Sequence, residues 1–157
     1  ARWSEFDLER NVWTIPDERM KMRAAHVVPL SQQAQAALGD LHPITGRYDL
    51  LFPGRADRNK PISENTPLSA LYRMGYHQRA TTHGFRALAS TILNESGFWH
   101  PDAIERQLAH KEQNAIRAAY HRSEYLDERT RMMQWWADLL DAAEATGKVT
   151  FGEKPAG

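Results

Sequence analysis

The chain contains no cysteine, which excludes disulfide bonds, thiolate metal sites and cysteine nucleophiles. Long apolar runs are also missing, and this excludes a hydrophobic membrane span. There is no excess of charge of either sign, because 20 Lys and Arg balance 20 Asp and Glu. The overall field of the protein therefore does not indicate a nucleic-acid partner, although binding depends on where basic groups cluster and such a partner stays open.

The length of 157 residues and the 41% of hydrophobic residues suit one globular domain. Residues 1–5 include no initiator Met and no signal pattern, so we expect a fragment cut from a longer protein. Residues 1–146 are predicted to form the domain, and residues 147–157 a flexible polar tail.

The first thirty residues carry the signals of β-strands. Strands are predicted over residues 2–8, 11–15 and 25–30, with a polar, basic loop over residues 16–23. A three-stranded antiparallel meander is the simplest arrangement of these segments.

The rest of the chain is predicted to be mostly helical, which gives an α+β, mainly α fold. Ser31 is an expected N-cap for a helix through Leu41, which Gly39 or Pro43 would end. Asn65 or Thr66, and then Thr81 or Thr82, are expected to cap the next two helices. The second of these covers residues 83–96, and further helices are expected over residues 101–108, 114–121 and 123–145.

The last of these helices is predicted to turn one apolar face to the core, with Leu126, Met133, Trp136, Leu139 and Leu140 on it.

His83 and Arg86 form the first pair of residues that could carry chemistry. Positions i and i+3 share a helix face, so the imidazole and the guanidinium point the same way. Such a pair is suited to holding a phosphate. The alternative is a histidine at a helix start beside an ordinary surface arginine.

A second group follows the helix that ends near His110. Tyr120 lies ten residues further on, between Arg117 and Arg122. A tyrosine can act as a covalent nucleophile when its neighbours activate it. Taken singly, His110 is usually a cation at a helix C-terminus. The alternative for Tyr120 is a half-buried helix aromatic with a solvated hydroxyl.

Lys21 lies in the basic loop between two predicted strands, flanked by Arg19 and Arg23. Basic hairpin loops are commonly only solvated, but they also reach readily toward DNA phosphates.

Taken in order, these signals resemble the catalytic part of the tyrosine recombinases, and most of all the phage and prophage integrases. The resemblance extends over about residues 1–141, and its phrases are residues 1–8, 13–16, 20–23, 28–31 and 104–110. It implies a helical catalytic domain with a small sheet, double-stranded DNA attachment sites as substrate, other recombinase protomers in a synaptic tetramer as partners, no cofactor or metal, and the bacterial cytoplasm as location.

The resemblance also implies a role for each residue. Tyr120 would attack a DNA phosphodiester and form a 3′-phosphotyrosyl link. Arg86 would stabilise the charge of the transition state, and His110 would donate a hydrogen bond to the phosphate. His83 would position or deprotonate the tyrosine, and Lys21 would protonate the leaving 5′-oxygen. Arg19, Arg23, Arg117 and Arg122 are candidate DNA contacts.

One part of the family pattern is missing from these residues. A first catalytic arginine is expected in a helix just before a phrase like residues 1–5, and Arg2 does not take its place. We therefore expect residues 1–146 to be a truncated catalytic domain and residues 1–157 to be inactive alone.

Some alternatives stay open. Tyr125 is a less well-spaced nucleophile. A non-catalytic DNA-binding module or a degenerate prophage remnant would not need Tyr120. A metal-dependent hydrolase is disfavoured, because the histidines lack ligand spacing. One of Trp135 and Trp136 is expected to pack within the chain and the other to contact a partner, against a helix that packs entirely within the chain.

Overall fold

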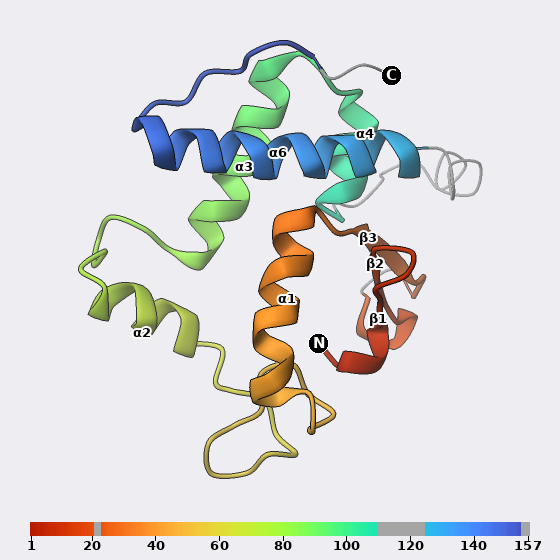
Figure 1. Ribbon diagram of the computed structural model, residues 1–157, viewed down its shortest axis with the longest axis vertical. Coiled ribbons are helices and arrows are strands. Elements are labelled where there is room, and N and C mark those ends of the chain that lie inside the picture. The colour runs from red at the N-terminus through yellow and green to blue at the C-terminus, as the bar shows by residue number, and fades with distance from the viewer. Residues whose placement is uncertain (21–22, 110–124, 155–157) are drawn as a thin grey trace.

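The computed structural model describes residues 1–20, 23–109 and 125–154 (Figure 1). Within these ranges the chain is mainly helical with one small sheet, so the predicted α+β class is confirmed. The strands are β1 (Phe6–Asp7), β2 (Val12–Ile15) and β3 (His26–Pro29). The α-helices are α1 (Gln32–Thr45), α2 (Thr66–Arg73), α3 (Thr82–Ser96), α4 (Pro101–Gln107) and α6 (Leu126–Thr146), and two 3₁₀ helices are η1 (Trp3–Glu5) and η2 (Asp17–Arg19).

The sheet is the predicted antiparallel meander in the order β1-β2-β3. Trp13 in the central strand lies opposite Phe6 in β1 and Val28 in β3. The rings of Phe6 and Trp13 stack with centroids 5.5 Å apart, which is a cross-strand pair of the kind that stabilises sheets.

The first strand is much shorter than the sequence predicted. Residues 2–8 were expected to be extended, but Trp3–Glu5 form η1 and only Phe6–Asp7 pair with β2. The cause is a contact with a distant segment. The Trp3 amide donates to the Asp49 carbonyl at 3.0 Å, and the indole meets the edge of His42 with ring centroids 5.0 Å apart.

Side-chain caps fix the starts of two helices where the sequence predicted them. Ser31 Oγ accepts from the Ala34 amide at 3.2 Å, and Thr81 Oγ1 accepts from the Gly84 amide at 2.9 Å. Thr81 rather than Thr82 is therefore the N-cap of α3. Gly97 ends α3 with a φ of 66°, a conformation that glycine adopts without strain.

Helix α1 continues past its predicted end at Leu41 and runs to Thr45. Pro43 lacks the N–H that would bind the Gly39 carbonyl, so the sequence favoured an earlier stop. Both residues are exposed, and water can bind the carbonyl that loses its partner. The proline is tolerated because it stands in the last turn on the solvent side.

The core lies where α3, α4 and α6 meet. Figure 1 shows α6 crossing α3 and α4, with α1, α2 and the sheet on one side of it. The buried cluster consists of Ile92, Leu93, Trp99, Ile104, Leu108, Met132, Trp135 and Leu139. None of the helices within the described ranges is long and apolar enough to cross a membrane.

The buried face of α6 differs from the one predicted. Met132, Trp135 and Leu139 lie in the core, whereas Leu140 is 45% exposed. The spacing of three and four residues centres the face on Trp135 and turns Leu140 away from it. After α6 the chain doubles back (Figure 1), and Phe151 packs against Trp135 with ring centroids 6.4 Å apart.

Candidate active site

His83 and Arg86 lie in the first turns of α3, just after the Thr81 cap. The spacing of three residues places them on one helix face, as predicted, and both are exposed. Arg86 Nη2 donates a hydrogen bond to the carbonyl of Leu108, which caps the C-terminus of α4. The guanidinium therefore connects the start of α3 to the end of α4.

The end of α4 also attracts two other basic side chains. Arg129 Nε donates to Gln107 Oε1 at 2.9 Å, and His26 forms a hydrogen bond with the backbone of Gln107. The carbonyl end of a helix carries partial negative charge, so it favours cations and donors at this place.

Arg129 is the most deeply buried charged group of this region. Its residue exposure is only 4%, and its Nη2 donates to the Val27 carbonyl at 2.6 Å. Burial first, and then repulsion from Arg106, lower the pKa of Arg129 from its usual value to about 10, so it stays charged at pH 7. This one guanidinium joins β3, α4 and α6.

Three arginines from three helices lie close enough to His26 for their charges to affect its pKa. Burial lowers the pKa of His26, and the positive charges of Arg129, Arg106 and Arg86 lower it further, while the hydrogen bond with the Gln107 backbone only partly compensates. His26 is therefore neutral at pH 7. We call Arg86, Arg106 and Arg129 the arginine cluster.

Two of the three arginines lack a carboxylate partner among the described residues. Within residues 1–20, 23–109 and 125–154, neither Arg86 nor Arg129 forms an ion pair with a carboxylate. Positive charge that the protein does not neutralise creates a site for an anion, and guanidinium groups match the oxygens of a phosphate.

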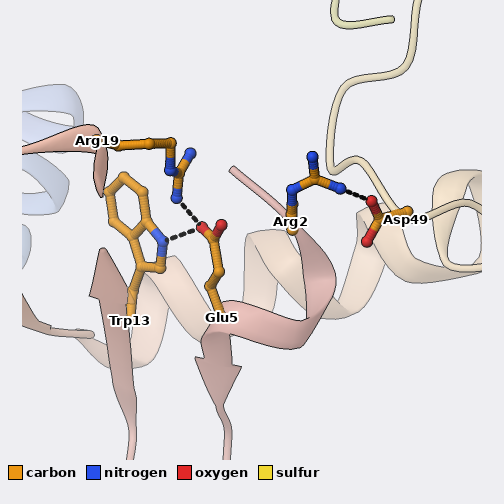
Figure 2. Close-up of polar contacts among 5 residues, drawn as sticks. All are labelled: Arg2, Glu5, Trp13, Arg19 and Asp49. Carbon is orange, nitrogen blue, oxygen red and sulfur yellow. Dashed lines mark hydrogen bonds and ion pairs between the residues drawn. The ribbon is translucent and has the colours of Figure 1, made fainter. Parts of the chain in front are cut away.

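A second polar group ties the basic loop to the sheet. Glu5 Oε2 accepts from Trp13 Nε1 at 3.0 Å and from Arg19 Nη2 at 2.5 Å (Figure 2). Arg23, at the other side of the loop, is exposed and has a φ of 48°. Arg2 pairs with Asp49 at the surface (Figure 2).

The comparison with known protein families shows which family the chain belongs to. The model of the phage integrase family matches residues 1–126, which is most of the chain. The chain belongs to the phage integrase family. No solved structure was found to match it significantly.

Several integrases are similar to this chain in sequence. The integrase of Enterobacteria phage P4 is 52% identical over 90% of the chain and 36% of its own length. The prophage integrase IntA of Escherichia coli strain K12 is 48% identical over 92% of the chain and 35% of its own length. The integrase of Shigella phage Sf6 is 45% identical over 89% of the chain and 36% of its own length. This integrase chain thus spans slightly more than a third of these relatives.

The structure describes only part of the predicted set of site residues. Arg86 contacts Leu108, which precedes His110 by two residues in the sequence, and His83 lies on the same face of α3. Arg19 and Arg23 lie in the basic loop, on either side of Lys21 in the sequence. Outside the described residues lie the predicted helix over residues 114–121 and the candidates Lys21, His110, Arg117, Tyr120 and Arg122.

Tyr125, the weaker candidate for the nucleophile, is the N-cap residue of α6. Its ring stacks on His100, with centroids 5.2 Å apart and an angle of 18° between the planes. His100 in turn caps α4, because its Nδ1 accepts from the Asp102 amide at 3.2 Å. Among the described residues, no group of three His, Asp or Glu side chains is placed to hold a metal ion.

Both indoles near the end of the chain contact its own core. Trp135 is buried against Phe98 and Trp99, and the half-buried Trp136 packs on the same cluster. The packing of one tryptophan within the chain is confirmed. The contact of the other with a partner protomer stays a prediction.

Sequence reasoning missed His26, Arg106 and Arg129. A signal for Arg129 existed, since it lies three residues before the buried Met132 on the core face of α6. A charged residue in line with core positions indicates a buried polar contact. His26 and Arg106 gave no such signal, because their importance depends on the packing of β3 against α4 and α6.

Proposed function

We propose that this chain forms the DNA-cleaving part of a site-specific recombinase that integrates and excises a phage or prophage genome. The observation that carries the proposal is the position of Arg86, whose guanidinium lies at the end of α4 without a carboxylate partner among the described residues. The substrate would be a double-stranded attachment site in the bacterial cytoplasm, and the working assembly a synaptic tetramer of protomers.

The proposed reaction is a transesterification. The Tyr120 hydroxyl oxygen attacks the scissile phosphorus, and the bond between phosphorus and the 5′-oxygen breaks. The products are a 3′-phosphotyrosyl link and a free 5′-hydroxyl. Lys21 gives its proton to the leaving 5′-oxygen, and the tyrosine proton is taken up by His83 or by water that it positions. A 5′-hydroxyl then reverses the same steps to rejoin a strand.

The other residues act on the phosphate. Arg86 binds the non-bridging oxygens and stabilises the charge that builds up in the pentacoordinate transition state. His110 donates a hydrogen bond to the same group. Each exchange replaces one phosphoester by another, so this chemistry needs no bound nucleotide as an energy source.

Further basic residues would hold the DNA backbone. Arg23, Arg117 and Arg122 are proposed as phosphate contacts, which would position the duplex without reading its sequence. Arg19 was expected to do the same, but its guanidinium binds Glu5.

The test uses the full-length gene product that contains this chain. It is mixed, in EDTA, with a nicked duplex that spans the end of the phage or prophage encoding it, and the products are separated under denaturing conditions. The nick lets the cleaved fragment diffuse away, so the covalent adduct accumulates. We expect an adduct that protease removes.

Tyr120→Phe and Tyr125→Phe are the matched pair, because each removes one phenolic oxygen. The adduct should disappear with Tyr120→Phe and persist with Tyr125→Phe, whose ring stacks on His100. A protein that binds the duplex but forms no adduct would be a DNA-binding module, and the catalytic assignment of all five residues would be wrong.

A further inference from the structure

We infer that Glu5 and Arg19 form a brace that positions the loop carrying Lys21, so that Arg19 assists cleavage through Lys21 and not by contacting a DNA phosphate. Glu5 and Arg19 are thus positioning residues. The inference rests on the proposed function, because the role of Lys21 as general acid belongs to it.

The brace is anchored in the sheet. Glu5 ends η1, and its side chain is only 7% exposed although it carries a carboxylate. Its Oε2 accepts from the Trp13 indole of the central strand, and the Trp13 ring stacks on Phe6. These contacts hold the carboxylate in one orientation without any contribution from the loop (Figure 2).

Arg19 completes the brace from the loop side. Its Nη2 lies 2.5 Å from Glu5 Oε2, a short charge-assisted contact (Figure 2). Burial alone would raise the pKa of Glu5, but hydrogen bonds from Trp13, the Arg2 backbone and Arg19 outweigh it and keep the pKa below its usual value. Glu5 is therefore ionised at neutral pH and can hold Arg19 by charge as well as by hydrogen bonding.

The brace acts close to the proposed general acid. Arg19 ends η2 and precedes Lys21 by two residues in the sequence. A fixed residue two positions away in the chain limits how far a lysine can move. General acid catalysis is sensitive to this, since the donor must come within hydrogen-bond reach of the leaving oxygen.

The neighbouring ion pair in Figure 2 shows what is special about the brace. The side chains of Arg2 and Asp49 are 54% and 58% exposed, so their pairing contributes little, whereas those of Arg19 and Glu5 are 41% and 7% exposed. Arg2→Gln is therefore a matched control: it removes an arginine from an ion pair of the same region without touching the loop.

The decisive experiment measures single-turnover cleavage by the full-length gene product with two nicked duplexes that differ in one atom. One duplex has the normal 5′-oxygen at the scissile phosphate, and the other has a bridging 5′-sulfur. A thiolate leaves without a proton, because thiols have a pKa of about 8.5, far below that of an alcohol. Loss of a general acid therefore slows cleavage of the first duplex only.

We expect Glu5→Gln and Arg19→Gln each to slow cleavage of the oxygen duplex about tenfold and to cleave the sulfur duplex within twofold of the unaltered protein. The double variant should be no slower than either single one, since both remove the same contact. Lys21→Ala should show the same pattern more strongly, and Arg2→Gln should cleave both duplexes normally. Glutamine at position 5 still accepts from Trp13, which protects the fold.

Salt dependence separates a brace from a DNA contact. Loss of one phosphate contact reduces the slope of log K against log salt by about 0.9. Arg19→Gln should leave the slope unchanged, whereas Arg23→Gln should reduce it.

The brace is overturned if Arg19→Gln lowers the slope, if the two variants cleave the oxygen duplex normally, or if the sulfur duplex does not rescue them. If the unaltered protein cleaves neither duplex, or Lys21→Ala cleaves the oxygen duplex normally, the proposed function itself fails and the brace fails with it.

Discussion

Replacing Arg129 by methionine tests whether a buried guanidinium joins β3, α4 and α6. Arg129 donates to Gln107 Oε1 and to the Val27 carbonyl, and hydrogen bonds from a charged donor stabilise a protein by about 1.5–3 kcal/mol each. The burial of the charged guanidinium opposes this stabilisation. The lowering of its pKa to about 10 corresponds to about 3 kcal/mol against the charged form.

The difference gives the expected effect. Methionine replaces the apolar stem of the arginine but makes neither hydrogen bond, so we expect Arg129→Met to lower the free energy of unfolding by about 2 kcal/mol. Arg129→Lys should lower it further, because lysine keeps a buried charge without the planar fork that reaches both acceptors. The order of stability should be arginine, methionine, lysine.

Urea unfolding of the chain, followed by tryptophan fluorescence, to which the core residues Trp99 and Trp135 contribute, measures these differences. Arg131→Met is the matched control, since Arg131 is exposed on the same helix and its loss should change stability by less than about 0.5 kcal/mol. The reasoning is refuted if Arg129→Met is as stable as the unaltered chain, or if lysine stabilises more than methionine.

Three further predictions concern single residues. Arg86→Lys should slow single-turnover cleavage by the full-length gene product about 100-fold or more while duplex binding is retained, and near-normal cleavage would contradict the role of the guanidinium fork. Because the pKa of His26 is lowered in the folded state, its contribution to stability is fully present above pH 6.5 and is lost as the pH falls below that value. Between pH 6.5 and 5, His26→Gln should therefore lose less stability than the unaltered chain. Equal losses in urea unfolding would exclude this. Thr81→Ala should lower the free energy of unfolding by about 1 kcal/mol and Thr82→Ala by much less, whereas equal effects would argue against the Thr81 cap.

Local patterns in the sequence predicted the parts of the fold that depend on neighbouring residues. The Ser31 and Thr81 caps and the Gly97 stop each involve residues within a few positions of one another. The meander followed from alternation and a short turn in the same way.

The parts that the sequence did not predict depend on distant contacts. Trp3 forms η1 instead of a strand because it contacts Asp49 and His42. The position of Arg129 on the core face of α6 indicates burial, but its acceptors, Val27 and Gln107, are known only once α6 packs against β3 and α4.

In the candidate site, too, the sequence predicted what depends on neighbouring residues and not what depends on distant contacts. The spacing of His83 and Arg86 predicts a shared helix face, and the structure confirms it. Spacing alone could not predict that Arg86 reaches the end of α4, or that Arg106 and Arg129 add their charge there, because these contacts arise only when three helices pack together.

The most direct test of the account is to identify the residue that becomes covalently linked to DNA. The covalent adduct of the full-length gene product is isolated under denaturing conditions and digested with nuclease and protease, and the modified peptide is sequenced by tandem mass spectrometry. The account predicts a nucleotide joined through its 3′-phosphate to Tyr120. A nucleotide on Tyr125 or on any other residue would contradict it.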